Sequence, residues 1–322
     1  MEKEYTYGVA RIRALETGLL TDEAVAQLLA SKNYEEGMTF LQDKGWGSQM
    51  TEVELDQMME EEKQKTMKVL QDIVDDASEY SILTIQDEFH NLKAAIKQVC
   101  TGVEVDHAFI EGTNLDPAFL MDKIREGKYE SLPANMQDVA KEATDTLLRT
   151  GDGQLCDLIV DRATLEAIKK EGTQAENDLI QKYADMQLTL ANIKIAIRGV
   201  QAGKDEQFLD HALVPCSGVS VSELKSASMG GLEAIFSYLE AIGFGEGVKA
   251  FQTSASVFEC WCDNQIVDII RGEKYKSFGI GPIIAYAIAR LNEIKTAKMI
   301  LLGKQNGFEE DFIRERVRRM YA

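Results

Sequence analysis

The feature of this 322-residue sequence that most constrains its fold is a segment that recurs at a fixed spacing. Residues 192–203 read NIKIAIRGVQAG, and a near copy, NLKAAIKQVCTG, lies 101 residues earlier at 91–102. A weaker copy, EIKTAKMILLGK, begins 101 residues later at Glu293. Self-similarity at a fixed period is the signature of a repeat architecture. We therefore predict a tandem triplication. The three expected repeats are residues 1–104, 105–208 and 209–322.

The repeated segment has the pattern of an amphipathic α-helix. Apolar residues recur at every third or fourth position, which places them on one face where burial stabilises a helix. In the middle copy these residues are Tyr183, Met186, Leu190, Ile193, Ile197 and Val200. Gly102, Gly203 and Gly303 close the copies, where we expect the left-handed C-terminal cap that glycine adopts without strain. Since the chain also has only four prolines, we predict an all-α fold with one long helix in each repeat.

Shorter helices are expected to begin at residues that cap a helix N-terminus. These are Thr21, Asp116, and either Ser220 or Ser222. A last short helix is expected over residues 309–321.

The charge balance limits the kinds of partner. The chain has 54 acidic and 35 basic residues, a formal net charge of −19. Nucleic acid and the cytoplasmic leaflets of membranes are both anionic, so each repels such a surface. We therefore expect protein partners, no nucleic-acid binding and no direct lipid binding.

The sequence has neither a signal peptide nor a candidate transmembrane helix. The longest stretch without charge, 277–289, has 13 residues, fewer than the roughly 20 that span a bilayer. The first residues, MEKEYTYG, lack the apolar centre of a signal peptide. The five cysteines form no framework, so we interpret them as reduced thiols. These features predict a protein on the cytosolic side.

The best enzymatic candidate is an acidic pattern formed by Asp72, Asp75, Asp76 and Glu79. On a continuous helix these carboxylates would share one face and could hold Mg²⁺, as in all-α isoprenoid synthases. Those enzymes need a second metal-binding motif, and the sequence has none. An exposed acidic face is the favoured interpretation. We expect no catalytic residue, no metal site and no cofactor.

Basic residues recur beside the apolar stripe of the repeated helix. Lys93 and Lys97 in the first copy correspond to Lys194 and Arg198 in the second, and Lys295 continues the position in the third. They either neutralise acidic neighbours or line a surface related by pseudo-threefold symmetry. The sequence leaves both interpretations open.

Motifs at the two ends of the chain resemble one family. The opening Tyr7–Leu15, YGVARIRAL, followed by Leu19-Leu20, is similar to the start of the C subunit of V-type and A-type rotary ATPases, which is the d subunit in eukaryotes. Phe278-Gly-x-x-Pro282-x-x-Ala-Tyr286, then Leu302-Gly-Lys-x-x-Gly307 and Ile313-Arg-Glu-Arg316, resemble its most specific signature. Gly281 departs from the family, which often has glutamate before this proline.

The resemblance implies a non-catalytic rotor subunit of the central stalk. It implies a funnel of three similar helical domains in pseudo-threefold arrangement, with central-shaft subunits of the D and F type in its cavity. The membrane rotor ring would lie at its base, on the cytoplasmic side. Such a subunit, a monomer when isolated, would transmit the torque that couples ATP hydrolysis or synthesis to H⁺ or Na⁺ transport. A free-standing helical scaffold and the Mg²⁺-dependent enzyme are the alternatives.

The residues expected to carry the family signature or to face partners are mostly basic. They are Arg11, Arg13, Lys93, Lys194, Glu293, Lys295, Gly303, Lys304, Arg314 and Arg316.

Overall fold

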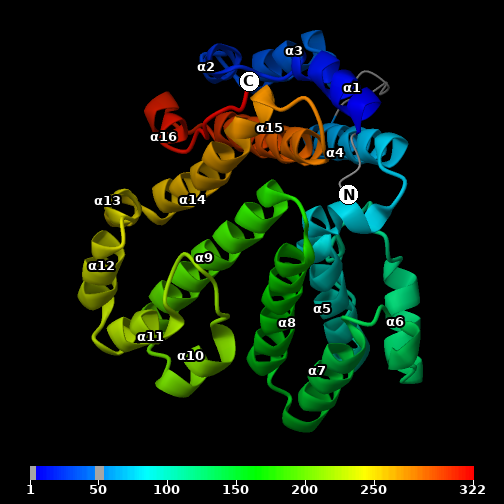
Figure 1. Ribbon diagram of the computed structural model, residues 1–322, viewed down its shortest axis with the longest axis vertical. Helices are drawn as coiled ribbons and strands as arrows, with labels where there is room; N and C mark the ends of the chain where they lie inside the picture. The colour runs from blue at the N-terminus through cyan, green and yellow to red at the C-terminus, as the bar shows by residue number, and fades with distance from the viewer. Residues whose placement is uncertain (1–4, 48–53) are drawn as a thin grey trace. The chain divides into compact units, whose positions relative to one another are not determined.

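The computed structural model describes residues 5–47 and 54–322, and within these ranges it contains helices and no strand, which confirms the all-α prediction (Figure 1). No helix in these ranges combines the length and hydropathy of a membrane span. The helices are α1 (Thr6–Glu16), α2 (Asp22–Leu29), α3 (Tyr34–Asp43), α4 (Leu55–Ile73), η1 (Ala77–Leu83), α5 (Ile85–Thr101), α6 (Pro117–Glu126), η2 (Tyr129–Ser131), α7 (Gln137–Thr150), α8 (Gly153–Gln174), α9 (Asp178–Gln201), α10 (Glu206–Ala212), α11 (Val221–Met229), α12 (Leu232–Ala241), α13 (Gly245–Thr253), α14 (Ala255–Ile270), η3 (Arg271–Tyr275), α15 (Gly281–Gln305) and α16 (Glu310–Arg314).

Side-chain caps begin several helices where the sequence predicts them. The Thr21 side chain accepts a hydrogen bond from the Ala24 N–H at the start of α2, and Asp116 accepts from Ala118 at the start of α6. Ser220 caps α11. Each cap satisfies an N–H group that has no partner within its own helix.

The prediction that a left-handed glycine ends each long helix is confirmed for two of the helices and wrong for the third. Gly102 after α5 and Gly203 after α9 have φ of 68° and 63°, the left-handed conformation. Gly303 instead lies inside α15, which continues to Gln305, and Gly307 adopts the left-handed conformation with φ of 69°. The third copy of the repeated helix is therefore longer, and Gly303 is free for a packing role.

The chain forms two compact units. Unit 1 comprises residues 1–80, 176–183 and 239–322, and unit 2 comprises residues 81–175 and 184–238. These units follow spatial contacts, whereas the three predicted repeats follow sequence similarity, so the division at residues 104 and 208 stays a prediction.

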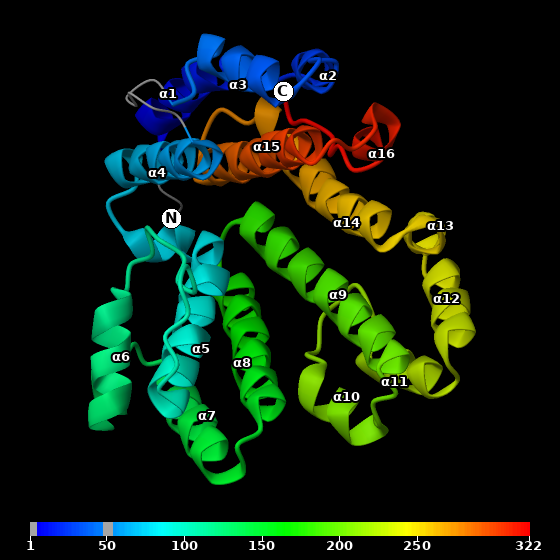
Figure 2. The same ribbon diagram turned by 180° about the vertical axis from the view of Figure 1, so that it is seen from behind.

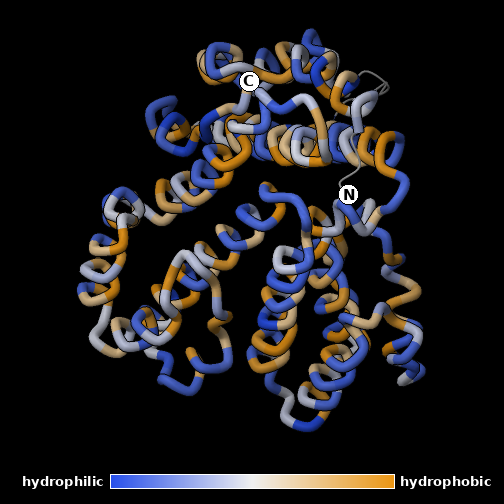
Figure 3. The backbone as a smooth tube through the Cα atoms, viewed as in Figure 1, coloured by the Kyte–Doolittle hydropathy of each residue, from blue (hydrophilic) through white to orange (hydrophobic). Residues whose placement is uncertain are grey.

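In unit 2, the helices that follow α5 in the sequence cover it. Helices α6, α7 and α8 all pack against α5, and Figure 2 shows α5, α7 and α8 running side by side. Phe89, Leu92 and Ile96 on the predicted apolar stripe of α5 are buried in this contact. Hydrophobic and hydrophilic residues are interspersed along the long helices (Figure 3), but residues 281–289 of α15 are buried at every position rather than on one face.

In unit 1, the first four helices cover α15, the last long helix. Helices α1 to α4 each contact α15, and α4 lies alongside it in both views (Figures 1 and 2). Leu28, Leu41 and Met58 share one buried cluster with Ile300 and Leu301 of α15. The long helix of the third predicted repeat is thus covered by helices of the first predicted repeat, as α5 is covered by helices of the second.

A buried polar residue at the start of each repeated segment holds a distant piece of backbone. Asn91 on α5 donates from Nδ2 to the Ile110 carbonyl and accepts from the Ile110 N–H, both at 2.8 Å. Asn192 on α9 makes the same pair with Val214, at 2.7 and 3.0 Å. In the third copy Glu293 replaces asparagine, and its Oε1 accepts from the Leu20 N–H at 3.0 Å.

These three contacts follow one rule. Each long helix holds the segment that opens the next predicted repeat, and the third long helix holds the opening segment of the first. A buried backbone N–H or C=O without a partner costs free energy. Each contact therefore fixes how the opening segment of a predicted repeat lies on the long helix that holds it. Within unit 1, a hydrogen bond therefore joins the last predicted repeat to the first.

The C-terminal segment differs from the prediction of a helix over residues 309–321. The helix α16 ends at Arg314, and residues 317–322 have no regular structure. The Arg319 N–H donates to Asn264 Oδ1 at 2.8 Å and the Met320 N–H donates to Asp22 Oδ1 at 3.0 Å. Side chains on other helices thus bind the backbone of residues 319 and 320, which lie outside any helix.

Candidate functional site

The acidic pattern proposed as a Mg²⁺ site does not lie on one helix. Helix α4 ends at Ile73 and Val74 is extended, so the i, i+3, i+4, i+7 geometry assumed for the four carboxylates is wrong. Asp72 pairs with Arg11 at 2.9 Å, and Glu79 accepts from the Tyr5 hydroxyl at 2.8 Å. Among residues 5–47 and 54–322, no group of three or more His, Cys, Asp or Glu is placed to hold a metal ion.

The five cysteines are free thiols, as predicted. Cys260 and Cys262 are buried, and the Cys260 thiol donates to the Val317 carbonyl at 3.3 Å. Burial raises the pKa of the Cys260 thiol, and it raises the pKa of Cys156 to about 11. The thiols of Cys260 and Cys156 are therefore protonated and poor nucleophiles near neutral pH.

The repeat-related lysines pair with acidic residues on neighbouring helices. Lys93 on α5 contacts Asp161 on α8 at 2.7 Å, and Lys295 on α15 contacts Asp263 on α14 at 2.6 Å. Asp161 and Asp263 occupy equivalent places in the second and third repeats. Lys194 lies half-buried on α9. For Lys93 and Lys295 the structure favours the interpretation that they neutralise acidic neighbours.

Two signature residues fasten unit 1 internally. The Arg13 guanidinium donates to the carbonyls of Glu273 and Lys276, at 2.6 Å each, and so holds the turn that precedes α15. Lys304 Nζ donates to the Leu29 carbonyl at 2.7 Å and to the Ser31 carbonyl. An ammonium group at this position satisfies carbonyls at the C-terminal end of α2.

Gly281 also has a packing reason to lack a side chain. An added Cβ there would collide with the Glu273 carboxylate, which is buried. Glu273 therefore occupies the space that a side chain at position 281 would need.

Glu293 belongs to a buried cluster of charges at the centre of unit 1. The Arg290 guanidinium lies between Glu293, at 2.8 Å, and Glu62 on α4, and it stacks over Trp46 at 4.5 Å from the ring centroid. Burial raises the pKa of Glu293, while Arg290 acts in the opposite direction. The pair Arg290 and Glu62 joins α15 to α4. The only sign of this ion pair in the sequence is that Arg290 and Glu62 are charged residues at positions that face the core.

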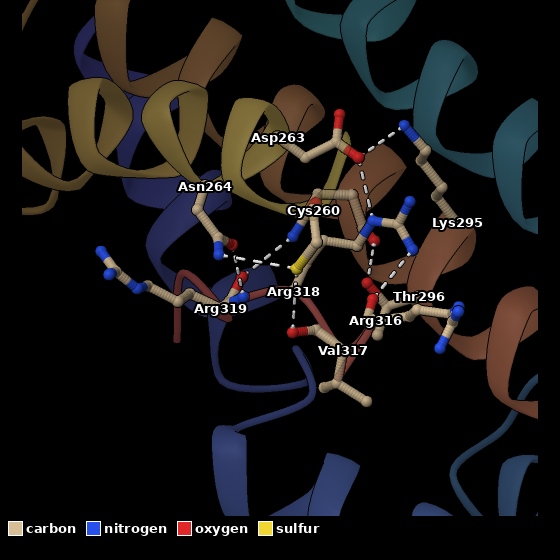
Figure 4. Close-up of polar contacts among 10 residues, drawn as sticks. Cys260, Asp263, Asn264, Lys295, Thr296, Arg316, Val317, Arg318 and Arg319 are labelled. Atoms are coloured by element: carbon tan, nitrogen blue, oxygen red, sulfur yellow. Dashed lines mark hydrogen bonds and ion pairs between the residues drawn. The ribbon is translucent and has the colours of Figure 1, made fainter. Parts of the chain in front are cut away.

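The C-terminal segment is fastened to α14 by a set of polar contacts (Figure 4). Asp263 Oδ2 accepts hydrogen bonds from Lys295 Nζ, at 2.6 Å, and from Arg318 Nε, at 2.9 Å. Asn264 and Cys260, on the same side of α14, bind the backbone at Arg319 and Val317. These contacts place α16 and the residues after it alongside α15.

A groove opens where α16 lies on α15. Gly303 permits the close approach, because an added Cβ would lie 2.8 Å from the Ile313 side chain. The groove encloses about 400 Å³. It is lined by Lys295, Lys298, Met299, Leu302, Gly303, Asn306, Phe308, Phe312, Ile313, Arg316 and Arg318. Lys295, Gly303 and Arg316 were candidate residues from the sequence, and the structure brings them together here.

The remaining candidate, Arg314, is exposed on α16, where it pairs with Glu310. Lys298 and Phe312 line the groove but were not singled out from the sequence. The signal was the exposed face of α15, on which Lys295, Lys298 and Leu302 recur at helical spacing.

Comparisons with known proteins place this geometry in a family. The chain matches the ATP synthase (C/AC39) subunit family over residues 8–316. It is 23% identical over 267 residues to the C subunit of the V-type sodium ATPase of Enterococcus hirae, an alignment that covers 82% of this chain and 81% of that protein. It is 24% identical over 344 residues to the C subunit of the A-type ATP synthase of Methanocaldococcus jannaschii, covering 96% and 85%.

Proposed function

Because the chain belongs to the ATP synthase (C/AC39) subunit family, whose members are structural rather than catalytic subunits of an ATP synthase complex, we propose that it is a central-stalk rotor subunit. In this role it links the central shaft of a V/A-type rotary ATPase to the membrane rotor ring. It transmits the torque that couples ATP hydrolysis or synthesis to H⁺ or Na⁺ transport. The observation that carries the proposal is the family match over almost the whole chain.

The repeat contacts support a body of three similar domains. Asn91, Asn192 and Glu293 occupy the same position in three long helices, and each holds the segment that opens the following repeat. Three equivalent modules joined in this cyclic order suit a funnel with pseudo-threefold symmetry. Shaft subunits of the D and F type would occupy its cavity, and the ring would lie at its base on the cytoplasmic side.

Internal bracing supports a torque-transmitting role. In unit 1 the opening segment is tied to α15 through Leu20 and Glu293, and the closing segment is tied to the start of α2 through Met320 and Asp22. A subunit that passes torque between two partners must resist being unwound, and ties between its first and last helices give that resistance.

The test is a coupling measurement in the cells that make this chain. Deleting its gene is expected to leave ATP hydrolysis by the detached head in the soluble fraction. ATP-driven ion uptake by membrane vesicles is expected to fall to background, and re-expression of the wild-type chain is expected to restore it. Measuring uptake of H⁺ and of Na⁺ separately identifies the coupled ion.

A double variant, Asp75→Ala with Asp76→Ala, is the matched control. Both residues are exposed, so a structural subunit is expected to restore coupling with the variant as well as with the wild type. Loss of coupling in a folded double variant would contradict the interpretation of these carboxylates as an exposed acidic face without a function. Normal coupling in the deletion strain, with the chain absent from the purified ATPase, would favour a free-standing scaffold.

A further inference from the structure

We propose that the groove between α15 and α16 binds an acidic amphipathic helix of another subunit of the same complex. This inference rests on the proposed function, because the partner is sought within the rotary ATPase. It goes further by naming one surface of this chain and the chemistry of the segment that occupies it.

The floor of the groove is apolar and open to solvent. Leu302 is 38% exposed, Phe308 52% and Phe312 44%, and the two rings meet edge to face with centroids 5.1 Å apart. Exposed apolar side chains that lie side by side and are rimmed by polar residues are a feature of interaction sites. The same residues would lose this exposed area if apolar side chains of a partner filled the groove.

The size of the groove suits a short helix. A cavity of about 150 Å³ holds one benzene ring, so the 400 Å³ of this groove accepts roughly two apolar side chains. Lys295, Lys298, Met299 and Leu302 form one face of α15, and α16 forms the opposite wall. Two apolar side chains one helical turn apart on a partner helix match a trough of this kind.

The charge of the groove selects an acidic partner. Four of its lining residues are cationic and none is acidic, on a chain with net charge −19. Two of the cations, Lys295 and Arg318, share the single carboxylate of Asp263. One carboxylate balances only one of these two charges. Arg318 is buried and Lys295 is exposed, so a carboxylate on a partner would meet the unbalanced positive charge at Lys295.

The other two cations have weak acidic neighbours. Lys298 pairs with Asp56 at 2.6 Å, but the Asp56 side chain is 80% exposed, and an ion pair in water of this kind contributes little free energy. Arg316 lies 3.9 Å from the Glu315 carboxylate, at the outer limit of an ion pair, but its guanidinium also stacks over the Phe312 ring and donates to the Phe312 carbonyl. A carboxylate of a docked helix can therefore replace Asp56 at Lys298 at small cost.

The charge also argues against other occupants. Anionic lipid head groups and nucleic acid would meet the repulsion of the whole acidic chain, whereas one short helix need approach only the groove. The apolar floor, in turn, gives a purely polar acidic segment nothing to bury. An amphipathic helix with acidic flanks can bury its apolar side chains on the floor of the groove and pair its carboxylates with the cations that line it.

Site-specific photo-crosslinking in the assembled complex tests the proposal. The photoreactive amino acid p-benzoylphenylalanine replaces Leu302 in an affinity-tagged full-length chain, the ATPase is purified and illuminated, and the adduct is sequenced by mass spectrometry. We expect an adduct to a segment with acidic residues on both flanks of apolar residues at helical spacing. The matched control places the same residue at Leu155, which is also 38% exposed, and is expected not to capture that segment.

A second pair of variants tests the charge. Lys298→Glu in the crosslinking chain is expected to lower the adduct yield about tenfold, equivalent to about 1.4 kcal/mol of binding free energy. Lys249→Glu is the control, because Lys249 lies outside the groove and, like Lys298, pairs with an exposed carboxylate, that of Glu246. It is expected to leave the yield unchanged.

Several outcomes would overturn the inference while leaving the proposed function intact. They are co-purification without any adduct, an adduct to a basic segment, to lipid or to a second copy of this chain, and a yield that Lys298→Glu does not lower. Failure of the chain to co-purify with the ATPase would overturn both proposals.

Discussion

At the residue scale, the repeated segment shows which residues are equivalent but not which contacts they make. The sequence reveals that Asn91 and Asn192 occupy equivalent positions, because they begin two nearly identical stretches. It does not reveal that both are fully buried, or that each binds one backbone N–H and one C=O about twenty residues further on. Such contacts depend on the path of the connecting segment, which has no repeated sequence pattern to follow.

Replacing either asparagine by leucine tests this contact. Asn91→Leu and Asn192→Leu each leave two backbone groups without a partner, so we expect a loss of about 2 to 4 kcal/mol in the free energy of unfolding. Hydrogen exchange is the direct readout, with the Ile110 amide deprotected in the first variant and the Val214 amide in the second. Asn135→Leu, at an exposed asparagine, is the control and is expected to change stability by less than about 0.5 kcal/mol. Unchanged protection at Ile110 and Val214 would contradict the role assigned to the two side chains.

The third position predicts a dependence on pH. Burial raises the pKa of Glu293, which faces Arg290, Glu62 and the Tyr286 hydroxyl. The folded protein therefore binds this proton more tightly than the unfolded chain, so the contribution of Glu293 to the free energy of unfolding falls as pH rises through the raised pKa.

Glu293→Gln keeps an oxygen acceptor for the Leu20 N–H but does not titrate. We expect the free energy of unfolding of the variant, relative to the wild type, to increase between about pH 5 and about pH 8, a range above the ordinary pKa of glutamate. Urea unfolding of both proteins at several pH values measures this difference. If the wild type instead becomes more stable relative to the variant over this range, then the effect of Arg290 is larger than that of burial and the pKa of Glu293 is lowered.

At the scale of elements, the sequence predicts most helices, but it predicts where they end less reliably. Apolar periodicity predicted the three long helices, and the caps Thr21, Asp116 and Ser220 predicted where shorter ones begin. There are two errors. The last helix ends at Arg314, and the N–H groups of Arg319 and Met320 bind Asn264 and Asp22 instead of continuing a helix. Helix α15 passes Gly303 because Gly307 provides the cap. In both cases, residues distant in sequence or a later glycine override the local signal.

The close contact between α15 and α16 makes Gly303 sensitive to size. In Gly303→Val the new side chain would enter the space of the buried Ile313 side chain, so we expect a loss of about 1 to 3 kcal/mol in the free energy of unfolding. Adding Ile313→Ala is expected to cost less in the valine background than in the wild type, because the two side chains compete for one space. Gly153→Val, at a helix start with nothing within 4 Å, is the control. Additive costs at Gly303 and Ile313 would contradict this packing.

The candidate site was foreseen only in part. The resemblance drew attention to Arg316 and Gly303, and the repeats drew attention to Lys295. The groove itself depends on how α16 turns back onto α15, and on Asp263 binding Lys295 and Arg318 together. Neither is visible as a spacing in the sequence. Conversely, Arg13 and Lys304 were expected as possible partner contacts, and the structure gives them internal carbonyl partners.

At the scale of the whole molecule, the cyclic order of the predicted repeats is the main architectural result. Helices α6 to α8 cover α5 within unit 2, and helices α1 to α4 cover α15 within unit 1. In these two cases, helices of one predicted repeat cover the long helix of the predicted repeat before it, and the first predicted repeat covers the last. For the proposed rotor role, this packing ties α1 to α4 to the last long helix within unit 1.

The most direct test of the rotor role is an electron cryo-microscopy reconstruction of the intact ATPase that contains this chain. A rotor subunit predicts density for the chain on the central axis, between the shaft and the membrane ring, contacting both and turning with them among the rotational states. Density on a peripheral stalk, or density that keeps its position relative to the stator while the ring turns, would contradict it.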